Sequence, residues 1–185
     1  MSYSETAGGS GSRFWRIAIR VVIPIAFAGF LYYIFTEVAR FGTVVSDSMV
    51  PTLEVGSWYI LRVDAYNGRS PERGEIVVFE APDGHFYAKR VVAIENDQIG
   101  TLSGRVFLNG EWIEEPYVRE DSLVMEATSV TRVPEDHVFL LGDNRNHSED
   151  SRDYGPVPTD MIMGEVRKII WPPSRARVLS PARSE

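Results

Sequence analysis

The sequence lacks cysteine altogether, which excludes disulfide bonds, thiolate metal sites and a thiol nucleophile. It is also short of cations, because 19 lysines and arginines stand against 26 aspartates and glutamates, a formal net charge of −7. This acidic balance argues against a nucleic-acid-binding protein, since such proteins carry a basic surface that neutralises phosphates. Only three histidines are present, so few imidazole-based sites are open to this chain.

No long amphipathic helix is apparent after residue 41, and short apolar runs rich in β-branched and aromatic residues take its place. The 185 residues suffice for one compact domain with a short appendage, but not for two full domains. Asn109-Gly110 indicates a two-residue hairpin, because both positions accept positive φ. The sequence therefore predicts a mainly β fold with an antiparallel sheet. The predicted strands are Trp58–Val63, Glu75–Glu80, Phe86–Ile94, Val106–Ile113, His137–Leu141 and Glu165–Ile170.

An apolar segment lies near the N-terminus. The sixteen residues from Val21 to Thr36 carry no charge. A membrane-spanning helix needs about 20 residues, a length that is reached when the segment is counted from Ile17 and the guanidinium of Arg20 extends back to the headgroups. We predict a transmembrane anchor over residues 17–38. Two alternatives stay open: a cleaved signal peptide, with a small-x-small site at Ala26-Phe27-Ala28, and a helix buried in the core.

The flanks of this segment predict its orientation and the remaining parts of the chain. Arginines precede the segment, so its N-terminal end should be cytoplasmic and the bulk of the protein should lie on the opposite side. Residues 1–16 are predicted to form a flexible cytoplasmic tail, residues 42–172 the β-rich domain, and residues 173–185 a polar C-terminal tail.

A loop serine follows the apolar segment. Ser46-Asp47-Ser48-Met49-Val50-Pro51-Thr52-Leu53 places a hydroxyl beside a proline-containing turn with apolar neighbours. By itself this pattern is weak, because most loop serines are solvated or cap a turn.

Lys89 lies within a predicted strand of mostly apolar residues. By strand alternation its side chain shares one face with Tyr87, Val91 and Ala93, whereas Arg90 points to the other face. Loss of hydration in such surroundings lowers the pKa of a lysine. A neutral amine of this kind is able to accept the proton of a serine. The competing interpretation is a lysine on a solvated face.

A polar loop from Gly142 to Pro158 follows the predicted strand His137–Leu141. It is longer than a connection requires and is dense in aspartate, asparagine, serine and arginine. The polar groups of such a loop often form hydrogen bonds only with one another, which is a purely structural role. Asp150 and Arg152 are placed to form an ion pair within it.

Together, and in this order, the three segments resemble the bacterial type I signal peptidases. In that family S-x-S-M-x-P-T-L follows a membrane anchor, Y-x-K-R-V lies on a strand, and G-D-N-R-x-x-S-x-D-S-R comes later. The segment from Arg73 to Phe79 is similar to the family's R-G-D-I-V-V-F strand, and Val106 to Tyr117 is similar to its V-x-x-N-G-x-x-x-x-E-P-Y hairpin. The resemblance runs from about Gly42 to Trp171.

The resemblance implies a serine endopeptidase in which Ser48 is the nucleophile and Lys89 the general base. Ser148 would donate a hydrogen bond that positions the amine, and the Ser46 hydroxyl with the Ser48 N–H would stabilise the oxyanion. Four charged residues would support the site: Asp143, Arg145, Asp150 and Arg152. Small apolar subsites would admit alanine-sized side chains one and three residues before the cleaved bond. The residues implied for these subsites are Met49, Pro51, Leu53, Tyr87 and Ala88.

The resemblance also implies partners and a location. The substrates would be exported preproteins with signal peptides, and membrane lipids would surround the anchor in the bacterial plasma membrane. The catalytic domain would lie on the extracytoplasmic face. No cofactor, metal, nucleic acid or obligate protein partner is predicted.

Two departures from the family pattern keep alternatives open. The turn Ala93-Ile94-Glu95-Asn96-Asp97 replaces the usual G-x-P-G-D, and His147 stands where asparagine is more frequent. A Ser-His-Asp triad through His147 is one alternative, and a metal hydrolase built from Asp143, His147 and Asp150 is another. A membrane-tethered β module that only binds peptides is a third. A dedicated processing peptidase would share the serine and lysine.

Overall fold

The computed structural model describes residues 11–33, 38–81, 83–118 and 127–181. The chain divides into two compact units, Met1–Val38 and Ala39–Glu185. They are described separately below.

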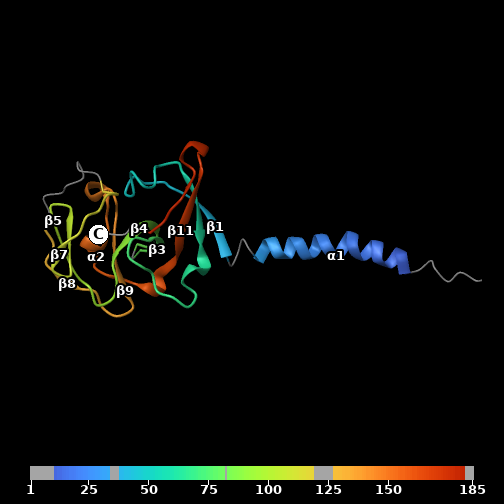
Figure 1. Cartoon of the computed structure of the whole chain (residues 1–185), viewed down its shortest axis with the longest axis horizontal. Helices are drawn as coiled ribbons and strands as arrows, with labels where there is room; N and C mark the ends of the chain where they lie inside the picture. The colour runs from blue at the N-terminus through green and yellow to red at the C-terminus, as the bar shows by residue number, and fades with distance from the viewer. Residues whose placement is uncertain (1–10, 34–37, 82, 119–126, 182–185) are drawn as a thin grey trace, which may run out of the picture. The chain divides into compact units, whose positions relative to one another are not determined.

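The described residues of the first unit include helix α1, from Gly11 to Tyr33 (Figure 1). Many of its apolar side chains are exposed, among them Ile23, Ile25, Phe27 and Phe30. Within the described ranges, no helix is long and apolar enough to cross a membrane.

The predicted boundaries of this region differ from the observed ones. Helix α1 begins at Gly11, so residues 11–16 of the predicted flexible tail are helical, and residues 1–10 lie outside the described part. No proline interrupts the chain before Pro24, and arginine favours helix, so the helix extends toward the N-terminus. Residues 34–37 of the predicted anchor also lie outside the described part.

The second unit consists of two antiparallel sheets, which confirms the prediction of a mainly β fold. The larger sheet has the order β1-β2-β11-β3-β4-β9-β10, with β12 paired to β11, and the smaller has the order β7-β6-β5-β8. The strands of the larger sheet are β1 Ala39–Thr43, β2 Trp58–Arg62, β3 Ile76–Glu80, β4 Phe86–Ala93, β9 His137–Leu141, β10 Val157–Pro158, β11 Ile162–Trp171 and β12 Arg177–Val178. Those of the smaller are β5 Gln98–Leu102, β6 Arg105–Leu108, β7 Glu111–Trp112 and β8 Thr131–Arg132.

Short helical turns connect several strands. They are η2 Val63–Tyr66, η4 Arg145–His147, α2 Ser151–Tyr154, η5 Thr159–Met161 and η6 Pro173–Arg175.

The β6–β7 hairpin has the predicted turn. Asn109 and Gly110 have φ values of 51° and 99°, and Leu108 pairs with Glu111 across them. Only residues that tolerate left-handed backbone make this tight connection without strain. The Asn-Gly prediction is confirmed.

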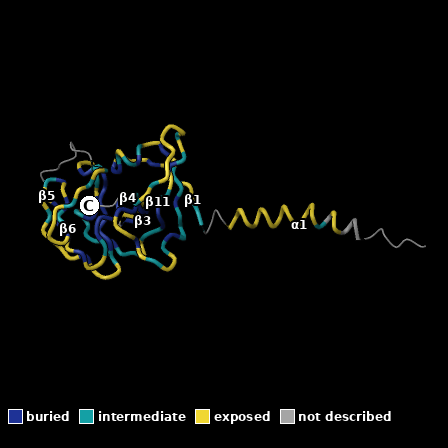
Figure 2. Tube along the Cα trace, viewed as in Figure 1, coloured by how far each residue is buried: buried dark blue, intermediate teal, exposed yellow. Residues whose placement is uncertain are grey.

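Strand β3 is buried on both faces, as its unbroken Ile-Val-Val-Phe run indicates. Ile76 and Val78 pack into one apolar cluster, and Val77 and Phe79 into another. Figure 2 shows the buried chain concentrated around β3 and β4. A central strand held from both sides gives β4, its neighbour, a fixed position for functional side chains.

The predicted C-terminal tail is partly folded. Strand β12 pairs with β11, the Leu179 N–H donates to the Arg167 carbonyl, and Leu179 packs against the core. Part of one edge of the long strand β11 is open to a further strand, and the alternating residues after Pro173 pair with it there. The described part of this tail ends at residue 181.

Candidate active site

Ser48 lies in a tight loop between β1 and β2, and its side chain is buried. The Leu53 N–H donates to the Met49 carbonyl at 2.8 Å, and Met49 and Leu53 are themselves buried in the core. These two apolar side chains fix the loop to the sheet. The hydroxyls of Ser46 and Ser48 lie 3.2 Å apart.

Lys89 lies on β4 and is almost completely buried, with 1% of its surface exposed. Its Nζ donates to Ser148 Oγ at 2.8 Å and lies 5.8 Å from the centre of the Tyr87 ring. Burial lowers the pKa of Lys89, and this effect outweighs the nearby charge of Asp150, which raises it. The amine is therefore shifted toward the neutral form that proton abstraction requires.

The predicted neighbours of Lys89 are only partly observed. Tyr87 and Val91 share one apolar cluster, as alternation indicates, whereas Ala93 packs into a different one. The β4–β9 pairing shifts register between Val91 and Ala93, and a bulge of this kind breaks the alternation of faces.

Asp150 organises the loop that carries Ser148. Its carboxylate accepts from Ser148 Oγ at 2.7 Å, from the Gly142 N–H at 3.0 Å and from Arg152 Nε at 2.8 Å. It also caps helix α2 through the Arg152 N–H. Burial alone would raise the pKa of Asp150, but these donors, the Arg152 guanidinium foremost, hold it below its usual value. The charged Asp150 thus receives the hydrogen bond of the Ser148 hydroxyl, so Ser148 accepts from the Lys89 amine instead of donating to it as predicted.

Gly142 lies where the serine loop meets the loop that carries Ser148. A Cβ added there would lie 2.2 Å from Ser148 Oγ and 2.6 Å from the Ser48 carbonyl oxygen. The Asn144 N–H donates to that same carbonyl at 3.0 Å, and Asn144 Nδ2 donates to the Asp47 carbonyl at 3.1 Å. Only glycine permits this close approach, which brings the serine loop against the loop that holds the lysine amine.

Two buried ion pairs surround the site. Arg90 binds Asp143 through two hydrogen bonds of 2.8 and 2.6 Å, and Thr52 Oγ1 donates to the same carboxylate. Arg145 binds Glu115 in the same bidentate manner and donates to the Gly142 carbonyl. Thr52, Arg90 and Glu115 were not among the predicted site residues. All three stand in the quoted motifs, Thr52 beside Leu53, Arg90 beside Lys89 and Glu115 in the hairpin motif, which is the signal that could have identified them.

A cavity of about 400 Å³ opens beside Ser48. Ser46 and Ser48 lie in its wall. Four of the predicted subsite residues line it as well, namely Met49, Leu53, Tyr87 and Ala88. Pro51 is exposed and is not part of this lining. The rest of the wall is mostly apolar, with Val44, Val45, Tyr59 and Phe86 among its members.

Strand β4 offers a free edge beside this cavity. It pairs with β3 from Phe86 to Arg90 but with β9 only from Arg90 onward. The Phe86–Lys89 stretch therefore has one edge without a strand partner among the described residues. An extended peptide is able to pair with such an edge.

The structure also bears on the histidine and metal alternatives. His147 Nδ1 lies 2.9 Å from Asp47 Oδ2, and both side chains are more than half exposed. Asp143 and Asp150 are each neutralised by a guanidinium, Arg90 and Arg152 respectively, so neither is a free metal ligand. In the described part of the chain, no group of three or more acidic or histidine side chains is arranged to hold a metal ion.

Comparison with known proteins identifies the family. Residues 14–171 match the family model described as signal peptidase, peptidase S26. Signal peptidase I of Bacillus caldolyticus is 34% identical over 85% of this chain and 88% of its own. The probable signal peptidase I-2 of Synechocystis sp. is 34% identical over 78% of this chain and 69% of its own. The crystal structure of a signal peptidase I from Enterococcus faecalis V583 matches over 53% of this chain and 97% of its own, with 27% identity and a TM-score of 0.46. The chain belongs to the type I signal peptidases of the S26 family, serine endopeptidases that cleave signal peptides from preproteins.

Proposed function

We propose that Ser48 is the nucleophile of this peptidase and that Lys89 is its general base. The observation that carries the proposal is the buried Lys89 amine, held by Ser148 at the junction with the Ser48 loop. The neutral amine takes the Ser48 proton as Oγ attacks the carbonyl carbon of the substrate. The resulting ammonium then gives that proton to the leaving amine as the C–N bond breaks. Water, activated by the same amine, hydrolyses the acyl-enzyme.

The remaining polar residues of the site stabilise charge and geometry. The Ser48 N–H and the Ser46 hydroxyl donate to the developing oxyanion, a contribution of about 3 kcal/mol for one such donor. Ser148 and Asp150 orient the amine of Lys89. Arg152 fixes Asp150. Asp143 and Arg145 hold the loop through their buried partners.

The substrate binds as an extended strand along the free edge of β4. Side chains of a strand alternate between faces, so the residues one and three before the cleaved bond point the same way. On one side of this edge lies the apolar cavity lined by Met49, Leu53 and Ala88. Its walls, which also include the Ser48 loop, select small side chains at those two positions.

Substrate specificity tests this assignment. We expect a preprotein with alanine one and three residues before the cleaved bond to be cut after the alanine, and leucine at either position to lower kcat/KM by at least about tenfold. Mass spectrometry and N-terminal sequencing of the product give the cleavage site. Leucine two residues before the bond is the matched control, since that side chain points to the other face. Equal tolerance at all three positions would contradict the model.

We further propose that the N-terminal segment anchors the enzyme in the plasma membrane by a single pass over residues 17–38, with residues 42–172 on the extracytoplasmic face. The exposed apolar side chains of α1 and the arginines before them support this orientation. Because the chain has no cysteine, single cysteines report topology directly. A membrane-impermeant maleimide should label Glu111→Cys in intact spheroplasts, and Ser4→Cys only after lysis. Labelling of both in intact spheroplasts would sink the proposed topology.

A further inference from the structure

Two further cavities neighbour the one beside Ser48. A bridging cavity of about 160 Å³ is lined by Ala81, Asp83, Tyr87, Glu149 and Tyr154. Tyr87 also lines the cavity at Ser48, so the two adjoin at this side chain. A larger cavity of about 390 Å³ shares the wall residues Ala81 and Tyr154 with the bridging cavity. We name this larger space the Tyr154 cavity.

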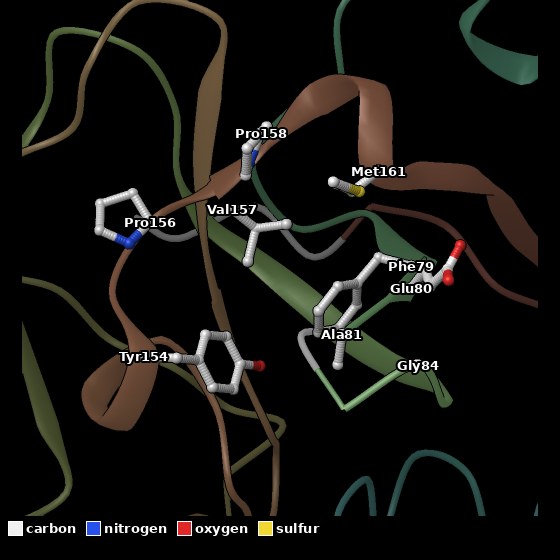
Figure 3. A pocket seen from close by; sticks show the side chains of 9 residues that line it. All are labelled: Phe79, Glu80, Ala81, Gly84, Tyr154, Pro156, Val157, Pro158 and Met161. Carbon is white, nitrogen blue, oxygen red and sulfur yellow. The ribbon is translucent and has the colours of Figure 1, made fainter.

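The Tyr154 cavity has the composition of a binding site for part of a peptide. Its wall is mostly apolar, including Phe79, Val157 and Met161. Figure 3 shows the Tyr154 ring reaching toward Ala81, with its hydroxyl at the near end. That hydroxyl is shielded from solvent and has no hydrogen-bond partner in the described part of the chain. A buried hydroxyl normally has a partner, and a ligand in this cavity is able to supply one.

The hydroxyl is suited to donate a hydrogen bond. Burial raises the pKa of Tyr154 well above its ordinary value, and the nearby acidic residues add to this effect. The group therefore stays neutral and keeps its proton. A peptide carbonyl is the acceptor that an extended chain supplies at regular intervals.

The position of Lys89 indicates which half of the substrate passes this way. Tyr87 and Lys89 share one side of β4, where Tyr87 packs against Phe79, whose ring also contacts Tyr154. Glu149, in the wall of the bridging cavity, directly follows Ser148, the partner of the amine. In the proposed mechanism this amine returns its proton to the leaving group, so the leaving chain must start beside it. That chain is the mature segment of the preprotein.

We propose that the Tyr154 cavity is a subsite for the mature segment of the substrate, where it takes an apolar side chain while the Tyr154 hydroxyl donates to a peptide carbonyl. This inference rests on the proposed Ser48 and Lys89 mechanism. Three carboxylates, those of Glu80, Asp83 and Glu149, line the two cavities and repel an acidic side chain. The enzyme thus selects an apolar side chain in the mature segment in addition to small residues before the cleaved bond.

The test uses the full chain in detergent and a set of preproteins with identical signal peptides. Leucine, serine or glutamate replaces one residue at a time along the mature segment, and kcat/KM is measured for each. We expect one position at which the preprotein with leucine is cleaved about tenfold faster than the preprotein with serine. The preprotein with glutamate at that position should be cleaved most slowly. Equal rates at every position would overturn the subsite and leave the Ser48 and Lys89 mechanism standing. Absence of cleavage in the whole set would overturn both.

Variants of the enzyme locate the preference. Tyr154→Phe removes only the hydroxyl, and Met161→Trp fills the mouth of the cavity from a side chain that is 47% exposed. In Met161→Trp the ratio of leucine to serine rates should fall toward one, whereas Tyr154→Phe should lower kcat/KM for both substrates alike, because the peptide carbonyl that the hydroxyl binds is common to them. Leu102→Trp, at a 50% exposed residue of the smaller sheet, is the matched control and should keep the ratio. An unchanged ratio in Met161→Trp together with unchanged kcat/KM in Tyr154→Phe would show that the preference arises elsewhere and would refute the proposal.

Discussion

Replacing Lys89 with alanine is expected to lower kcat by on the order of 10³-fold or more, because the serine then has no base. Ser48→Ala should lower kcat by as much, and the double variant should lower it little further, since the two residues act as one unit. Lys168→Ala is the matched control: this lysine, the only other one in the chain, is exposed on β11 and should be dispensable. Activity in Lys89→Ala together with loss in His147→Ala would shift the mechanism to the histidine alternative.

The pH profile gives an independent measurement of the same base. Burial lowers the pKa of Lys89 from its ordinary value of 10.5, and the reactive form is the neutral amine. As pH rises through this lowered pKa, kcat/KM should rise and level off, and as pH falls through it, activity should be lost. A profile that stays flat down to acidic pH would exclude Lys89 as the base.

The fold was predictable where strands are long and apolar. The unbroken run of β3 and the Asn109-Gly110 turn identify their structures by local chemistry alone. Five strands were not predicted, namely β1, β5, β8, β10 and β12. Of these, β10 is only Val157–Pro158, and it is a strand because it lies opposite Val138 and His137. Periodicity cannot reveal two residues whose conformation is set by a partner distant in sequence.

The site, like the fold, was predictable only in part. Alternation predicted an apolar setting for Lys89, and its burial agrees. The partners of the buried guanidinium groups could not be predicted, because Arg90 and Asp143 are 53 residues apart and Arg145 and Glu115 are 30 apart. Spacing within one segment carries no information on which distant carboxylate neutralises which arginine. That choice follows from the register of the sheet.

The Arg90–Asp143 pair is the feature whose loss should destabilise the domain most. Their side chains are 3% and 0% exposed, and they join β4 to the Thr52 turn and to the loop that follows β9. Asp143→Ala leaves the Arg90 charge buried without a partner, and we expect the free energy of unfolding to fall by about 3–5 kcal/mol. Urea unfolding, monitored by tryptophan fluorescence, measures it. Activity should fall as well, because the same contacts hold the Ser48 loop against β4.

A surface pair provides the scale for that result. Glu54 and Arg175 also form an ion pair, but each side chain is over 40% exposed, so Glu54→Gln should cost no more than about 1 kcal/mol. The double variant Arg90→Met/Asp143→Leu removes both charges together and should recover much of the stability lost in Asp143→Ala, because no unpaired charge stays buried. A loss in Asp143→Ala no larger than that in Glu54→Gln would mean that water reaches Arg90. The serine loop would then depend on Met49 and Leu53 for its position, rather than on the buried charges.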